Sequence, residues 1–151
     1  MSDTRPMPTS VQISEQMAKV ARRDTRPELE LRRELHARGM RYRIDIAPDP
    51  GLRGRADILF RSARVAVYVD GCFWHSCPAH GVLPKGNRDW WRAKLKATVL
   101  RDRTTETALR HLGWTVVRVW EHEEPVSAAD RVETAIRRAK EMASTEMLKV
   151  V

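Results

Sequence analysis

Cysteine and histidine side chains are concentrated at residues 70–77, which read DGCFWHSC, and shortly beyond them. Cys72 and Cys77 are separated by four residues, at the upper end of the spacing found in zinc sites. His80 follows after two more residues, and His122 lies just beyond a later apolar run. These four side chains predict a tetrahedral Cys2His2 zinc site. The alternative is a pair of buried free cysteines and two surface histidines.

A further histidine, His75, lies between the two cysteines. An imidazole titrates near neutral pH, so His75 could act as a general base in a nearby active site. Alternatively, His75 is itself the zinc ligand and His80 is free. The spacing does not distinguish these two assignments.

Asp57 lies in GRADILF, at the start of an apolar run that follows a glycine-rich turn. Mg²⁺ prefers oxygen ligands and is usually held by one or two carboxylates together with substrate phosphate. Asp57 is therefore a candidate ligand for a divalent cation. The alternative, which the spacing by itself favours, is a carboxylate that closes the turn or pairs with Arg55.

Large aromatic side chains lie among polar and cationic residues in two places. Phe73 and Trp74 occupy a polar turn, and Trp91 lies near the start of a predicted helix rich in arginine and lysine. Flat side chains beside cations suit a DNA surface, where they can wedge between base steps. The cations of this helix include Arg88, Arg92, Lys94, Lys96, Arg101 and Arg103. Trp91 also fits a buried position, because it shares a helix face with Leu95 and Asp102.

The composition limits the class of protein. A chain of 151 residues suits a single domain. Its 28 lysine and arginine residues exceed its 20 acidic residues, and a net charge of +8 favours a polyanionic partner such as nucleic acid. There is no apolar run long enough to span a membrane and no signal-peptide pattern at the N-terminus, so a cytoplasmic location is expected. Two cysteines so close together are a poor disulfide framework.

Alternating helical and extended patterns predict an α/β domain with a mixed sheet covered by helices. We expect residues 1–13 to be a flexible tail and residues 14–146 to form one domain that includes the zinc-stabilised segment. The expected helices are 14–23, 24–39, 88–113 and 127–144, the last capped by Ser127. The expected strands are 40–46, 56–60, 65–70 and 114–120. If the strands at 65–70 and 114–120 are parallel, residues 72–77 (the cysteine segment) and His122 follow the two strands at the same edge of the sheet.

The helix at 24–39 has clear end signals. Thr25 and Glu28 have the spacing of a capping box, and Gly39 can end the helix. Leu31 and Leu35 continue the face that begins at Glu28, which predicts that this carboxylate turns toward the core.

Several of these segments resemble one protein family in their residue identities and in their order along the chain. TRPE, GRAD, VYVDGCFWHSC, NRDWW, the RD at 101–102 and GWTVVRVWEHE occur in the order seen in the very-short-patch-repair (Vsr) mismatch endonucleases. The resemblance covers about residues 14–124. It implies a restriction-endonuclease-like α/β fold and a monomer. It also implies Mg²⁺-dependent nicking of duplex DNA beside the thymine of a T·G mismatch, the product of 5-methylcytosine deamination.

The resemblance also assigns site residues. It implies that Asp57 binds Mg²⁺, together with the main-chain carbonyl of Val69. It implies that His75 is the catalytic histidine and that Glu28 and Asp102 support the site.

On the same resemblance, Phe73, Trp74 and Trp91 enter the base stack near the mismatch. Arg88 and Arg92 are candidate DNA contacts because they lie beside the tryptophans in the cationic helix. Cys72 and Cys77 match zinc cysteines.

The chain departs from the best-known pattern at four positions. Val69 replaces a threonine, a change that preserves a carbonyl ligand. Asp70 replaces a histidine and either adds a metal ligand or closes the turn. His80 must replace a lost histidine if zinc remains four-coordinate, and His122 replaces a distal cysteine.

Two other functions remain open from the residues alone. One is a zinc-stabilised DNA-binding module without catalysis. The other is a restriction endonuclease that cuts fully paired or methylated sites.

Overall fold

The computed structural model describes residues 24–72, 77 and 83–149 of the chain. Within them, a sheet of four strands has the order β1-β2-β3-β4. The strands are β1 (Arg43–Ile46), β2 (Ala56–Phe60), β3 (Val65–Asp70) and β4 (Thr115–Trp120). The first three strands pair antiparallel, whereas β3 and β4 are parallel neighbours. The predicted mixed sheet is confirmed. The parallel pairing of β3 and β4 meets the condition under which Cys72 and His122 leave the same edge of the sheet.

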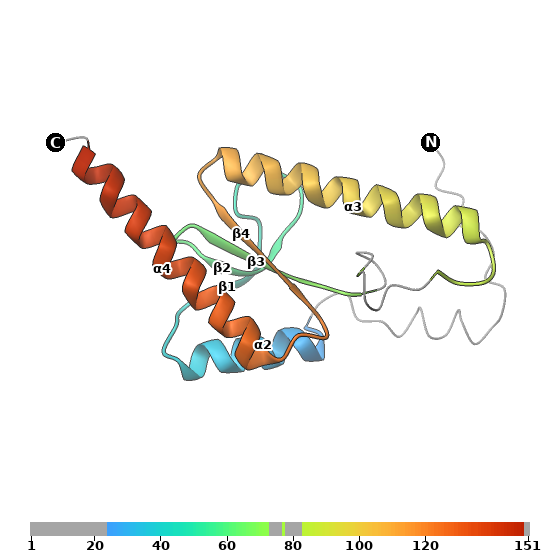
Figure 1. Cartoon of the computed structure of the whole chain (residues 1–151), viewed down its shortest axis with the longest axis horizontal. Helices are drawn as coiled ribbons and strands as arrows, with labels where there is room; N and C mark the ends of the chain where they lie inside the picture. The colour runs from blue at the N-terminus through green and yellow to red at the C-terminus, as the bar shows by residue number, and fades with distance from the viewer. Residues whose placement is uncertain (1–23, 73–76, 78–82, 150–151) are drawn as a thin grey trace.

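Helices cover both faces of this sheet (Figure 1). Helices α2 (Arg26–Ala37) and α4 (Pro125–Lys149) lie together on one face, and α3 (Arg88–His111) runs along the other. The crossover from β3 to the parallel strand β4 passes through α3, as parallel strands require. Helix α3 begins at Arg88, downstream of Cys77 in the chain.

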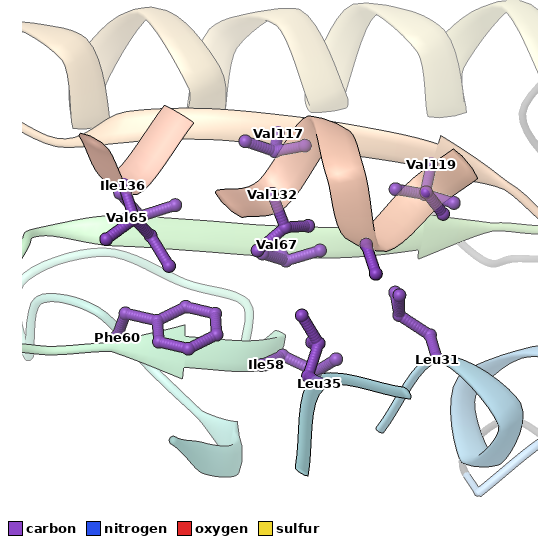
Figure 2. Close-up of a cluster of buried hydrophobic side chains, with 12 residues drawn as sticks. Leu31, Leu35, Ile58, Phe60, Val65, Val67, Val117, Val119, Val132 and Ile136 are labelled. Atoms are coloured by element: carbon purple, nitrogen blue, oxygen red, sulfur yellow. The ribbon is translucent and has the colours of Figure 1, made fainter. Parts of the chain in front are cut away.

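The main core lies between the sheet and the pair α2 and α4 (Figure 2). Leu31 and Leu35 enter it from α2, and Val132 and Ile136 enter it from α4. The strands contribute alternate residues, as a half-buried sheet dictates; these are Ile58, Phe60, Val65, Val67, Val117 and Val119.

A smaller cluster contains Ala56, Leu59 and Ala66, with Tyr68 and Trp114 packed against it.

The element boundaries differ from the sequence predictions mainly at the ends. The first described strand begins at residue 43 rather than 40, and α4 spans 125–149 rather than 127–144. Ser127 lies inside α4, so its prediction as the cap is wrong; Pro125 begins the helix because its fixed φ suits a first turn. Thr25 is at the N-cap of α2, but its side chain makes no capping hydrogen bond. The predicted helix at 14–23 lies outside the described residues.

No helix in the described part of the chain is long and apolar enough to cross a bilayer.

Candidate functional site

Asp57 lies at the start of β2, next to the end of β3. Its Oδ2 accepts a hydrogen bond of 2.7 Å from the backbone amide of Val69. Arg55, the alternative partner considered from the sequence, lies 3.4 Å from Asp45 Oδ2 instead. The Asp57 carboxylate is thus directed along the sheet and does not close a surface ion pair with Arg55.

The surroundings of Asp57 oppose its negative charge. Burial is the largest effect and raises the pKa of Asp57 to about 7, with further increases from the carboxylates of Glu28 and Asp70. The Val69 amide and Arg32 act in the opposite direction and do not compensate. A bound divalent cation would stabilise the ionised form of Asp57, and carboxylate oxygens are the ligands that Mg²⁺ prefers.

Glu28 projects from the first turn of α2 and is only 4% exposed, as its helix face predicted. Its Oε2 accepts hydrogen bonds from the Asp24 backbone amide at 3.1 Å and from Arg32 Nη2 at 3.2 Å. Burial raises the pKa of Glu28, and Arg32 opposes that rise. Arg32 therefore holds this buried acid in one position beside the Asp57 region.

Asp70 ends β3 and is 5% exposed. Its two carboxylate oxygens lie 3.2 and 3.1 Å from Nη1 of Arg118, on the neighbouring strand β4. Its backbone carbonyl accepts a hydrogen bond from the Glu121 amide at 3.0 Å. The buried acid and its arginine partner join the ends of β3 and β4.

Arg118 also reaches helix α3. Its Nη2 donates to the backbone carbonyl of Asp102 at 3.3 Å, and its Nε lies 3.4 Å from Glu106 Oε2. Its guanidinium lies over the ring of Tyr68, 4.8 Å from the ring centroid. Through Arg118 the turn of α3 that carries Asp102 is fixed to β3 and β4.

A second group of ligands forms where β3 and β4 end. Ligand atoms of Cys72, Cys77 and His122 all lie within 4.8 Å of one another. Nδ1 of His122 is 3.2 Å from the Cys72 sulfur and 3.8 Å from the Cys77 sulfur. Both cysteines are buried, and no disulfide joins them. The parallel pairing of β3 and β4 brings these distant residues together, as the sequence predicted for adjacent strand ends.

Backbone hydrogen bonds fix the geometry of the cysteine segment. The Cys77 amide donates to the Cys72 carbonyl at 2.9 Å, and the Cys72 amide donates to Glu121 Oε1 at 3.0 Å. Burial raises the pKa of Cys72 to about 11, with Cys77 and Glu121 adding to the effect. Two thiols and an imidazole at these distances fit a zinc ion, which binds thiolates and displaces their protons.

Four predicted site residues fall outside the described residues: Phe73, Trp74, His75 and His80. Trp91 is described; it is 8% exposed and packs edge-on against Trp90, with ring centroids 4.8 Å apart. Arg88 and Arg92 are exposed near the start of α3.

Sequence reasoning did not identify Arg32, Tyr68 or Arg118. Arg32 had a usable signal, since it lies four residues after Glu28 on the same helix face. Tyr68 and Arg118 had none, because polar residues at alternate strand positions normally face solvent.

Comparison with known proteins gives the family. A family model described as DNA mismatch endonuclease Vsr matches residues 7–79. The type II nicking enzyme V.NaeI of Lentzea aerocolonigenes is 45% identical over 125 residues, covering 82% of this chain and 75% of that protein. The DNA mismatch endonuclease Vsr of Escherichia coli K12 is 36% identical over 109 residues, 72% of this chain and 68% of that protein. The chain belongs to the Vsr family.

Another relative of this Vsr-family chain is the type II nicking enzyme V.XorIIP of Xanthomonas oryzae pv. oryzae, 41% identical over 108 residues, 71% of this chain and 77% of that protein. Membership of the Vsr family confirms the family, fold and enzyme class that the sequence predicted. The protein is a DNA endonuclease of restriction-endonuclease-like fold, and its mismatch-endonuclease character follows from the family.

Proposed function

We propose that this protein is a Mg²⁺-dependent endonuclease that nicks duplex DNA beside the thymine of a T·G mismatch, the lesion left by deamination of 5-methylcytosine. The observation that carries the proposal is the half-buried Asp57 carboxylate, bound by the Val69 amide and placed among other acids. The names of its relatives, mismatch endonuclease and nicking enzyme, support the same reaction class.

Asp57 and the Val69 carbonyl are the proposed ligands of Mg²⁺. In an antiparallel pair the amide and carbonyl of one residue face the same neighbouring strand. Since the Val69 amide bonds to Asp57 on β2, the Val69 carbonyl is directed to the same side. When bound, Mg²⁺ supplies positive charge for the scissile phosphate.

The chain supplies the remaining chemistry. His75 is the proposed general base, which takes a proton from the attacking water at an imidazole nitrogen. Glu28 and Asp102 are the proposed supporting acids. Arg32 holds Glu28 in position, and Arg118 holds the turn of α3 that contains Asp102.

Zinc has a structural role in this proposal. Cys72, Cys77 and His122 are three ligands, and His80 is the proposed fourth. A closed tetrahedral site would fix the segment between the cysteines, which carries His75, against the ends of β3 and β4.

The proposed DNA surface is the first part of α3 and the adjoining cysteine segment. Arg88 and Arg92 are exposed there and suit phosphate contacts. Phe73 and Trp74 are the proposed aromatic residues that enter the base stack. Trp91, only 8% exposed and packed against Trp90, is not proposed for this role. We propose a monomer that acts in the cytoplasm, where bacterial DNA lies.

The test uses end-labelled duplexes that differ at one base pair. With Mg²⁺, the protein should nick the thymine strand of a T·G duplex and leave matched T·A and C·G duplexes intact. Equal cleavage of the matched duplexes would favour a nicking enzyme of paired sites, and binding without cleavage would favour a DNA-binding module.

A further inference from the structure

The hydroxyl group of Tyr68 is unusual within the described part of the chain. Its oxygen is buried and has no hydrogen-bond partner there. A buried hydroxyl without a partner costs folding free energy, and such groups in native proteins commonly have a function or a bound water.

The strand register places Tyr68 beside the proposed metal ligand. Ile58 on β2 is opposite Val67 on β3, so continuing the register by one residue puts Asp57 opposite Tyr68. Side chains of opposed residues share one face of a sheet and have neighbouring Cβ atoms. Asp70, two residues after Tyr68, projects from the same face.

Burial is the largest effect that raises the pKa of the Tyr68 hydroxyl; Arg118 opposes it, and the carboxylates of Asp57, Asp70 and Asp102 add to it. They come from β2, β3 and α3, so the hydroxyl lies in a region where acids from three elements converge. A neutral phenol in such a region is a hydrogen-bond donor among acceptors.

The position of the ring is fixed by Arg118. The two residues are register partners on β3 and β4, and the guanidinium lies over the ring at 4.8 Å. Arg118 is itself held by Asp70 and by the Asp102 carbonyl. The hydroxyl is therefore placed by a network that joins β3, β4 and α3.

We propose that Tyr68 is a positioning residue of the nicking site. Its hydroxyl donates a hydrogen bond to a water molecule held between Asp57 and the neighbouring carboxylates of Asp70 and Asp102. A water molecule fits because it can donate to carboxylates while it accepts from the hydroxyl, as buried waters do. A DNA phosphate is not the acceptor, because the hydroxyl is buried.

The inference rests on the proposed function, since it places the divalent cation at Asp57. Hydrogen-bond partners around metal ligands set the orientation of those ligands, and their loss weakens metal binding by about 10- to 100-fold. Mg²⁺ sites in particular retain several waters, which need such partners.

The test compares Tyr68→Phe with a matched control, Tyr42→Phe. The Tyr42 hydroxyl has a partner, the Arg32 carbonyl at 2.9 Å. Mn²⁺ is titrated into the zinc-loaded protein and its binding is followed by electron paramagnetic resonance. The part of the Mn²⁺ binding that is lost in Asp57→Asn is assigned to the proposed cation site at Asp57.

For Tyr68→Phe we expect Mn²⁺ affinity to fall about tenfold. Its melting temperature should stay unchanged or rise slightly, because a buried hydroxyl without a protein partner is removed. For Tyr42→Phe we expect the reverse, a melting temperature lower by a few degrees and unchanged Mn²⁺ affinity, because the hydrogen bond lost is to a backbone carbonyl of α2 that is not a proposed metal ligand.

Unchanged Mn²⁺ affinity in Tyr68→Phe would overturn the inference, as would the absence of any Asp57-dependent Mn²⁺ binding. Nicking of the T·G duplex by the wild-type protein is measured separately. Its absence would count against the proposed function, whereas the Mn²⁺ comparison would still decide the role of Tyr68.

Discussion

The carboxylate of Asp57 accepts a 2.7 Å hydrogen bond from the backbone amide of Val69, across the pairing of β2 and β3. This bond fixes one oxygen of the acid to the strand whose next residue, Asp70, carries a second buried acid. The two proposed Mg²⁺ ligands are thus joined directly, without an intervening side chain. The geometry leads to predictions about charge, zinc and catalysis.

Stability of the metal-free protein should depend on the titration of Asp57. Burial raises the pKa of Asp57 from 3.8 to about 7. Between these values the folded state keeps a proton that the unfolded state has released, so this group makes the fold less stable as pH rises toward 7. Asp57→Asn cannot ionise. The melting temperature of Asp57→Asn minus that of the wild-type protein should therefore become larger between pH 5 and pH 8. A constant difference across that range would contradict the raised pKa of Asp57.

Zinc should be bound at Cys72, Cys77 and His122 and should stabilise the fold. Purified protein should contain about one zinc per chain, and strong chelators should lower its melting temperature. His122→Ala should lose zinc, whereas His111→Ala, at an exposed position on α3, should keep it. Metal-free wild-type protein of undiminished stability would argue against the site. Zinc loss in His75→Ala but not in His80→Ala would make His75 the fourth ligand.

Trp74 should act in recognition more than in folding. Trp74→Ala should reduce the preference for T·G over T·A duplexes by about tenfold, since an aromatic stacking contact to a base is lost. Its melting temperature should change little. By contrast, Trp91→Ala should lower the melting temperature, because Trp91 is buried and packs against Trp90. A large loss of stability in Trp74→Ala would identify Trp74 as a core residue.

His75 should contribute to the chemical step. His75→Ala should slow single-turnover nicking on the order of a hundredfold or more if the imidazole is the general base. DNA affinity and zinc content should be retained. A folded, zinc-loaded variant that nicks at the wild-type rate would exclude this role.

Much of the fold could be predicted from local patterns. The strands at 56–60 and 65–70 were predicted with the bounds that the structure has, because each is a short apolar run between polar turns. The burial of Glu28 was predicted from its helix face. The meeting of the cysteine segment with His122 was predicted only on the condition that two strands are parallel, a property that single-strand patterns do not contain.

The environment of the candidate site could not be predicted in the same way. Arg118 and Tyr68 are half-buried, and Arg118 bonds to the Asp102 carbonyl of α3 from a strand position that alternation assigns to solvent. The capping hydrogen bond predicted for the Thr25 side chain does not form, again because of contacts in the folded protein. Glu28 uses its carboxylate to bind the Asp24 amide and Arg32, contacts that depend on the packed site and not on the helix alone.

The central claim is that Asp57 holds the catalytic cation, and single-turnover nicking of a T·G duplex by Asp57→Asn tests it most directly. Asp45→Asn is the matched control, because Asp45 pairs with Arg55 at the surface. Asp57→Asn should lose Mg²⁺-dependent nicking by at least about a hundredfold while it binds the duplex as tightly as wild type or more tightly, since a carboxylate that repels phosphate is removed. Asp45→Asn should nick at the wild-type rate. Wild-type nicking by folded Asp57→Asn would contradict the account.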